Sequence, residues 1–293
     1  MVGGGGPLRG SVRWAYNTRA WEPTEQEWLL ASRCIPLEEK QRVQKFVFKA
    51  DAKAAMAGCL MIRKLAHLVT GDPNDKIEII RENGRPRVKT TNIHLDFNIS
   101  HQGHFTVLAG EVGNDVIVGA DVMNLHRKTG SHLSEFFRLM NKTCSSDEWN
   151  TILSSNSEEQ RAAMFFRFWC LKESFTKATG VGVRSDMRHI SFQLRTPWLN
   201  EKTPVTDTFV EIDRVKNSAW CFHEWLLDPK HCVAVALSSK ANTCPNVEPV
   251  PFTFLTLSDL LRDLEPMLPP DVISCHSFLK KEESGRAHED SVL

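Results

Sequence analysis

The sequence predicts an α+β fold of two similar lobes, each a small mixed sheet packed on one long helix. Two observations lead to this prediction. The order of helical and strand-like segments over residues 12–112 is found again over residues 113–240, and each stretch contains one long helical segment, at about 49–69 and 158–179. The halves share no evident sequence identity, so only the order of elements repeats. We expect a pseudo-two-fold axis to relate the N-terminal lobe (12–112) to the C-terminal lobe (113–240).

The first half begins with a strand at 12–15 and a short helix at 24–33. The stretch PLEEKQRVQKF predicts a helix, because Pro36 and the acidic residues after it are typical of a first helical turn. Residues 49–69, rich in Ala, Leu, Met and Lys, predict the long helix. Strands are then expected in KIEIIRENGRPRVK, which turns at Asn83-Gly84, and in LDFNIS and FTVLAGE.

The second half begins with a strand at 115–123, DVIVGADVM, which carries Asp121 near its end. A long helix is expected from Asn156 to Ala178, because Ser or Asn caps its start and Gly180 follows its end. Further strands are predicted at HISFQL, TFVEIDRV, SAWCFHEWLL and HCVAVALS. Outside the lobes, we expect a flexible N-terminus (1–11) and a partly disordered C-terminal appendage (241–293) with an amphipathic segment at 255–264.

Composition narrows the class of protein. Lys plus Arg and Asp plus Glu number 36 each, and this zero net charge argues against nucleic-acid binding. The N-terminus lacks the apolar core of a secretory signal, and charges interrupt every apolar stretch long enough to span a membrane. Eight cysteines lack CxxC spacing, which indicates reduced thiols. We therefore expect a cytoplasmic monomer that binds neither nucleic acid nor membrane.

Three stretches place polar residues where burial is expected. FNISHQG puts His101 after a strand, VGADVM puts Asp121 at a strand end, and FWCLKESFTKATG puts Glu173 and Lys177 one turn apart on a helix rich in aromatic residues. Each has a structural alternative: a packed or exposed histidine, a turn-forming aspartate, and a surface ion pair worth roughly 0.2–0.5 kcal/mol.

Together these residues fit phosphate chemistry. Asp121 and Glu173 offer the oxygen ligands that Mg²⁺ prefers, and Lys177 with Arg42, Arg81 and Arg85 offers charge for phosphate groups. The chain has neither GxxxxGK[ST] nor GxGxxG, so a P-loop or Rossmann nucleotide site is not indicated. Spacing alone does not show that these groups meet in space.

The stretches GRP, FNISHQG, VGADVM and FWCLKESFTKATG resemble, in order and spacing, the motifs of the phosphopantetheinyl transferases. The resemblance extends from Val12 to about Ser238 and favours the larger, two-lobed, surfactin-synthetase-activating class. It implies transfer of the 4′-phosphopantetheine arm of coenzyme A (CoA) to a serine of an apo carrier protein, releasing adenosine 3′,5′-bisphosphate. The implied partners are carriers of the fatty-acid synthase, mitochondrial and aminoadipate-semialdehyde dehydrogenase types.

The resemblance also implies roles for individual residues in a cleft between the lobes. Asp121 and Glu173 would hold Mg²⁺, Glu173 would also serve as the base, and Lys177 would bind the pyrophosphate. The 3′-phosphate and adenine would be bound by Arg42, Arg81, Arg85, His101, Asn98 and Ser100.

One position departs from the family pattern. Many relatives carry an acidic third ligand where this chain has Met123, and a water or Gln102 is the expected substitute. The alternative function is a non-catalytic module that binds CoA or a carrier. The presence of Glu173, Asp121 and Lys177 together disfavours that alternative.

Overall fold

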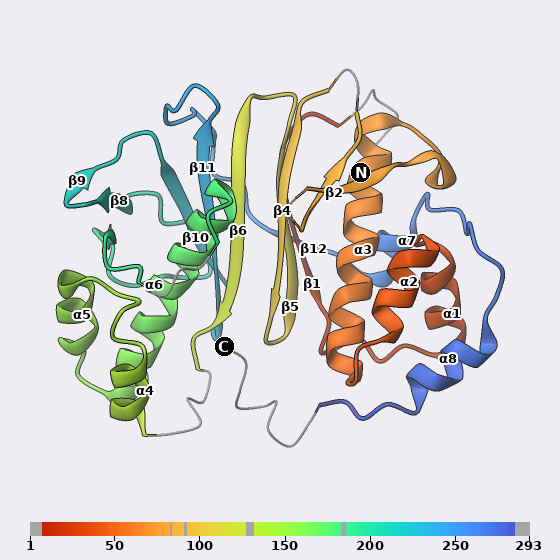
Figure 1. The fold of residues 1–293 in the computed structure, drawn as a ribbon, viewed down its shortest axis with the longest axis horizontal. Coiled ribbons are helices and arrows are strands. Elements are labelled where there is room, and N and C mark those ends of the chain that lie inside the picture. The colour runs from red at the N-terminus through yellow and green to blue at the C-terminus, as the bar shows by residue number, and fades with distance from the viewer. Residues whose placement is uncertain (1–7, 83, 91–92, 127–131, 183–185, 285–293) are drawn as a thin grey trace.

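The computed structural model describes residues 8–82, 84–90, 93–126, 132–182 and 186–284. It is a mixed α/β structure with several small sheets, and Figure 1 shows two lobes that meet at the strands in the centre. In the N-terminal lobe the sheet order is β12-β1-β5-β4, next to the hairpin β2-β3. The elements of this lobe are β1 (Gly10–Asn17), α1 (Glu25–Arg33), α2 (Leu37–Gln44), α3 (Lys49–Thr70), η1 (Asn74–Lys76), β2 (Ile79–Glu82), β3 (Arg85–Val88), β4 (Leu95–Gln102) and β5 (Phe105–Val112).

The C-terminal lobe contains an antiparallel sheet of order β10-β11-β6 and a second small sheet, β7-β8-β9. Its elements are β6 (Val116–Asn124), α4 (Leu133–Leu139), α5 (Ser146–Leu153), α6 (Glu158–Thr179), β7 (Ile190–Gln193), β8 (Phe209–Ile212), β9 (Val215–Lys216), β10 (Cys221–Asp228) and β11 (His231–Ser239). The sequence analysis did not predict α4 or α5. For α5, the capping box formed by Ser145 and Glu148 at the start of the helix was a sequence signal that could have predicted it.

The two lobes repeat one topology. In each, a first strand (β1 or β6) precedes the long helix (α3 or α6), and a closing hairpin (β4-β5 or β10-β11) places its second strand beside the first. The predicted repeat of element order is therefore present. The expected mixed sheet is found only in the N-terminal lobe, where β12 (Thr253–Phe254) runs parallel to β1.

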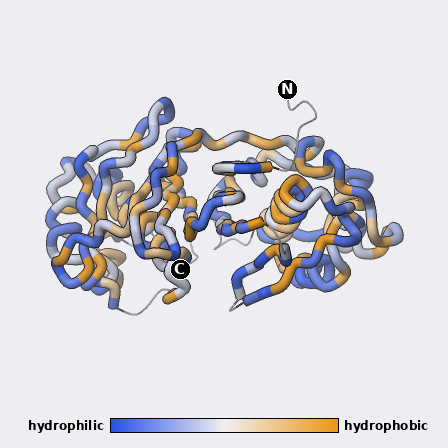
Figure 2. Tube along the Cα trace, turned by 90° about the horizontal axis from the view of Figure 1, so that it is seen from above, coloured by the Kyte–Doolittle hydropathy of each residue, from blue (hydrophilic) through white to orange (hydrophobic). Residues whose placement is uncertain are grey.

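Each long helix packs on its own sheet, and a third core lies between the two sheets. Viewed from above, the lobes lie side by side (Figure 2). The N-terminal core includes Trp28, Leu60, Phe97 and Leu108, and the C-terminal core includes Phe165, Phe168, Phe192 and Phe222. The third core includes Val107, Val118, Trp225 and Val235. Burial of these apolar side chains joins the lobes as well as stabilising each one.

Strands β4 and β6 lie next to each other at the junction of the lobes (Figure 1) but belong to separate sheets. Polar side chains of β4 replace the backbone acceptors that a continuous sheet would provide. Backbone N–H groups of β6 donate to them: Val118 to Asp96 (2.7 Å), Ala120 to Asn98 (3.2 Å) and Asn124 to Gln102 (2.6 Å). Within this series Ser100 instead donates to the Asp121 carboxylate, so the polar ladder changes partner at the predicted site.

Helix α6 lies directly against β6 because of Gly119. A Cβ atom at this position would lie 2.0 Å from the Ser174 carbonyl oxygen and 2.5 Å from the Ala178 nitrogen. Only glycine permits such close approach of two backbones. The contact fixes α6 relative to Asp121, with Glu173 and Lys177 on the adjoining turns of the helix.

The chain after residue 240 packs against the N-terminal lobe. Strand β12 joins the sheet beside β1, α7 (Leu257–Leu261) packs on α3, and α8 (Val272–Leu279) packs on α1. The predicted amphipathic segment thus corresponds to α7. Most of the predicted flexible N-terminus (residues 1–7) and the end of the appendage (285–293) fall outside the described residues. Among the described helices, none combines the length and apolarity needed to cross a membrane.

Candidate active site

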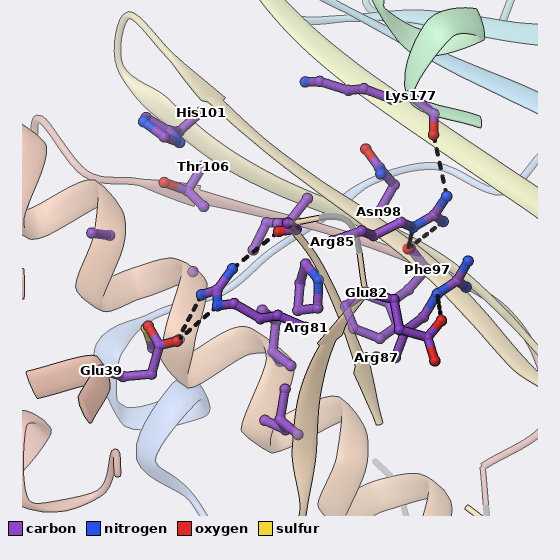
Figure 3. A pocket seen from close by; sticks show the side chains of 18 of the residues that line it. Glu39, Arg81, Glu82, Arg85, Arg87, Phe97, Asn98, His101, Thr106 and Lys177 are labelled. Atoms are coloured by element: carbon purple, nitrogen blue, oxygen red, sulfur yellow. Dashed lines mark hydrogen bonds and ion pairs between the residues drawn. The ribbon is translucent and has the colours of Figure 1, made fainter. Parts of the chain in front are cut away.

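A cavity of about 870 Å³ lies between the lobes, lined by α2, α3 and β2–β4 on one side and by the C-terminal part of α6 on the other. Residues predicted for the site line it from both lobes, as Figure 3 shows for part of the set. They are Arg42, Arg81, Arg85, Asn98, His101, Glu173 and Lys177. The two remaining predicted residues, Ser100 and Asp121, contact the Lys177 side chain.

At the α6 end of the cavity, Lys177 Nζ donates to Asp121 Oδ1 (2.6 Å) and to Ser100 Oγ (2.8 Å). The other carboxylate oxygen, Asp121 Oδ2, is buried and has no hydrogen-bond partner among the residues that the structure describes. Burial, and then the charge of Asp121, raise the pKa of Glu173 to about 7 despite the opposing charge of Lys177. The Glu173 carboxylate is therefore near the Asp121 carboxylate, the Lys177 ammonium is bonded to Asp121, and one buried Asp121 oxygen remains unsatisfied among the described residues. This donor set fits a hard divalent cation.

Neither Met123, which stands at the position of the family's third acidic ligand, nor Gln102, one of the two expected substitutes, is free to act as that ligand. Met123 is buried in the C-terminal core. Gln102 Oε1 accepts the Asn124 N–H at 2.6 Å and so belongs to the polar ladder between the lobes. Of the two alternatives named from the sequence, a water fits this geometry better.

At the other end of the cavity, Glu39 connects two of the predicted arginines. Its carboxylate accepts hydrogen bonds from Arg42 Nε and from Arg81 Nη2, both at 2.7 Å (Figure 3 shows the Arg81 pair). Burial opposes ionisation of Glu39, yet the bonds from Arg81 and Arg42 outweigh it and lower its pKa. The Glu39 carboxylate thus orients both guanidinium groups. Sequence reasoning missed Glu39, although its i,i+3 spacing from Arg42 was a visible signal.

Arg85 lies between the lobes and its donors contact protein groups. It donates to the Asp96 carboxylate (3.0 Å) and to the Phe97 carbonyl (2.6 Å) within its own lobe, and Figure 3 shows the contact with Phe97. Across the junction it donates to the carbonyls of Val118 (2.7 Å) and Lys177 (3.2 Å).

Arg87 pairs with Asp96 as well, and the sequence analysis named neither residue. Arg87 lines the same cavity as Arg85. Its position two residues after Arg85 in one strand, which puts both side chains on the same face, was the signal available in the sequence.

His101 and Asn98 occupy β4 between the two ends of the cavity. His101 lies beside Thr106 of the paired strand β5 (Figure 3). Desolvation, and next the Lys177 ammonium, lower the pKa of His101, and Arg42 acts in the same direction. His101 is thus near charged groups of both lobes. The side-chain oxygen of Asn98, Oδ1, accepts a hydrogen bond from the Ala120 N–H. The side-chain nitrogen, Nδ2, is therefore left for other partners.

A cavity lined by Glu173 and Lys177 from one lobe and by arginines from the other is typical of a protein that handles phosphate groups. Residues 19–113 match the family described as "4'-phosphopantetheinyl transferase, N-terminal", and residues 117–236 match the "4'-phosphopantetheinyl transferase superfamily". The chain belongs to the 4′-phosphopantetheinyl transferase family, whose co-substrate is CoA and whose protein substrates are carrier proteins.

Curated relatives agree with this assignment over most of the chain. The L-aminoadipate-semialdehyde dehydrogenase-phosphopantetheinyl transferase of Xenopus laevis is 38% identical over 287 residues, covering 94% of both chains. The protein of the same name from Homo sapiens is 37% identical over 291 residues, again covering 94% of both. A phosphopantetheinyl transferase of Thraustochytrium is 31% identical over 236 residues and covers 78% of both chains.

Proposed function

We propose that this chain transfers the 4′-phosphopantetheine arm of CoA to a serine of apo carrier proteins in a Mg²⁺-dependent reaction. The observation that supports this most is the convergence of Asp121, Glu173 and Lys177 at one end of a cavity whose other end carries Arg42 and Arg81. One cavity thus offers groups for both the pyrophosphate and the nucleotide side of one extended co-substrate.

In this reaction the serine hydroxyl oxygen attacks the pantetheine-side phosphorus of the CoA pyrophosphate. The new bond is serine O–P, the bond that breaks joins this phosphorus to the bridging oxygen, and the electron pair leaves on adenosine 3′,5′-bisphosphate. Glu173 accepts the serine proton, a role to which its raised pKa is suited. Lys177 turns from Asp121 toward the pyrophosphate and stabilises charge on the departing side.

Asp121 and Glu173 are the residues that would hold Mg²⁺, because the unpartnered Asp121 Oδ2 and the Glu173 carboxylate offer oxygen ligands with excess negative charge. The bound ion supplies neutralisation of phosphate charge and orientation of the pyrophosphate. Ser100, held by Lys177 and bonded to Asp121, keeps that carboxylate in place.

On the nucleotide side, we assign Arg42, Arg81 and His101 to the 3′-phosphate and Asn98 to the adenine pocket. Arg85, also expected to contact the nucleotide, lines the same cavity, whereas Ser100, expected in the adenine pocket, contacts Asp121 and Lys177. Arg85 in addition positions the junction of the lobes through its bonds to Val118 and Lys177.

The test is to incubate the protein with an apo carrier, CoA and MgCl₂, and to follow the carrier by intact-mass spectrometry. We expect the carrier to gain one phosphopantetheine arm, to gain none with EDTA, and to regain transfer when Mg²⁺ is restored. Binding of CoA without any gain of mass would instead establish the non-catalytic module.

Replacing Arg42 with alanine is expected to raise the KM for CoA more than it lowers kcat. A charge-assisted contact contributes roughly 1.5–3 kcal/mol, so the KM should rise by about tenfold or more. The same variant should lose preference for CoA over 3′-dephospho-CoA, measured as the ratio of kcat/KM for the two. Arg138→Ala, an exposed arginine of α4, is the control and should keep both values. Full preference in Arg42→Ala would assign Arg42 another task.

The remaining assignments follow from the same considerations. We propose carriers of the fatty-acid synthase, mitochondrial and aminoadipate-semialdehyde dehydrogenase types as protein substrates, because the relatives carry the last name and the cleft is open to solvent. We divide the chain into lobes at 12–112 and 113–240, related by a pseudo-two-fold axis; β1 extends the first lobe to Gly10, and described residues after 240 pack on the same lobe as an appendage. The repeated sheet order supports that division. We also propose a monomer in the cytosol, and the eight free cysteines are consistent with that compartment.

A further inference from the structure

Residues 271–283, here called the C-terminal segment, comprise all of α8 with its N-cap Asp271 and the chain just after the helix. The segment lies outside both family matches, of which the second ends at residue 236. Figure 1 places α8 beside α1, at the end of the N-terminal lobe where α3 begins. It is anchored in the core of this lobe: the Phe278 ring stacks on Trp28 at 3.4 Å, and Cys275 is buried.

The segment holds helix α2 by side chains and backbone. Lys40 Nζ pairs with Asp271 at 2.9 Å, with the Lys40 side chain only 7% exposed, and Gln44 Nε2 donates to Ser274 Oγ at 2.6 Å. Lys281 Nζ donates to the carbonyls of Gln44 (3.2 Å) and Phe46 (2.6 Å), the last turn of α2 and the loop that follows.

The same segment completes the start of α3. The first N–H groups of a helix have no partner within the helix, and the N-cap residue Phe48 offers no side-chain acceptor. The carbonyls of Glu282 and Glu283 accept the N–H groups of Lys49 (2.8 Å) and Ala50 (3.0 Å) instead. Lys53, buried in α3, pairs with the Glu283 carboxylate at 2.5 Å.

Helix α2 connects these contacts with the cavity. Glu39 and Arg42, one turn apart, line the cavity, whereas Lys40 and Gln44, also one turn apart, contact the C-terminal segment from another face. A helix of eight residues whose N-cap, Pro36, makes no side-chain hydrogen bond has little stability of its own. Its position, and that of the Arg42 guanidinium, therefore depends on tertiary contacts.

We propose that the C-terminal segment is a positioning element for CoA binding, which sets the place of Arg42 by holding α2 and the start of α3. This rests on the proposed function, because it takes Arg42 as a ligand of the CoA 3′-phosphate. The segment touches no substrate itself. It acts through α2. Loss of its contacts should therefore raise the KM for CoA and leave kcat at saturating CoA unchanged.

The test compares Lys281→Met with Lys280→Met, its exposed neighbour, in the full chain. Both remove one ammonium, but only Lys281 bonds the α2–α3 loop. Lys281→Met should speed hydrogen exchange of the amides at 45–50 and raise the KM for CoA by roughly five- to tenfold, the effect of about one lost hydrogen bond. Lys280→Met should change neither, and Lys281→Arg, which keeps donors, should restore both.

The outcomes separate this inference from the proposed function. If Arg42→Ala raises the KM but Lys281→Met speeds exchange without raising it, the segment does not position the site and the inference is overturned. The inference is also overturned if hydrogen exchange at residues 45–50 is unchanged in Lys281→Met, provided that the thermal midpoint shows the variant to be folded. If Arg42→Ala itself leaves the KM unchanged, the assignment of the CoA site fails first, while the carrier-loading assay still reports transfer.

Discussion

Replacing Glu173 with glutamine is expected to lower kcat by roughly 10²–10⁴-fold, the range that general base catalysis contributes. Glutamine keeps the shape and one oxygen but cannot accept the serine proton, and it is a weaker ligand for Mg²⁺. The protein should still fold, because the charged form of Glu173 destabilises the folded state. Burial and the neighbouring Asp121 charge disfavour that form, as the raised pKa of Glu173 shows. The thermal midpoint in EDTA should therefore stay the same or rise.

Carrier loading followed by mass spectrometry at saturating CoA gives kcat for this comparison. The matched control is Glu158→Gln, at the exposed start of the same helix, which should keep normal turnover. Near-normal kcat in Glu173→Gln would exclude Glu173 as both base and metal ligand. Loss of activity together with a lowered thermal midpoint would indicate damage to the fold in place of lost chemistry.

Replacing Gly119 with alanine is expected to damage both stability and transfer. The added methyl carbon would lie 2.0 Å from the Ser174 carbonyl oxygen and 2.5 Å from the Ala178 nitrogen, so α6 must move away from β6. Overpacking of this kind costs typically about 1–3 kcal/mol, and backbone atoms on the opposite side give less room than a flexible side chain would. The movement also separates Glu173 and Lys177 from Asp121.

Urea denaturation measures the loss of unfolding free energy, and carrier loading measures the loss of kcat. Gly58→Ala is the control for stability alone: its Cβ would meet side-chain atoms, Ile99 Cδ1 at 3.2 Å and Thr106 Cγ2 at 4.0 Å, and alanine favours the helix in which Gly58 lies. Wild-type stability in Gly119→Ala would contradict direct packing of the α6 backbone on β6.

Local sequence patterns were sufficient for most of the secondary structure. The long helix α3 follows from its composition, and α6 follows from the cap at its start, Ser157, and from the left-handed Gly180 at its end. Short helices without strong periodicity, such as α4, were not predicted. Their stability comes from packing, here Phe136 against Phe165, which the local sequence does not show.

Most residues of the candidate site could also be predicted from the sequence, since they lie in short motifs with distinctive polar groups. What the motifs did not contain was the set of partners. Asp96 and Arg87 were missed because their importance lies in a contact between strands, and Glu39 was missed because its second partner, Arg81, is distant in sequence. Likewise, the ladder of β4 side chains to the β6 backbone depends on which strand edges meet.

By itself, the sequence determined the inventory of this protein: two lobes in one order of elements, a carboxylate pair, a lysine and several arginines. Only the tertiary structure decided how each of these groups is held. It showed that Arg85 bonds across the lobes, that Asp121 keeps one oxygen without a partner, and that the chain after residue 270 completes α2 and α3. The physical reason is that helices and strands form from nearby residues, whereas the partner of a buried charge or an uncapped backbone group comes from whichever distant segment packs against it.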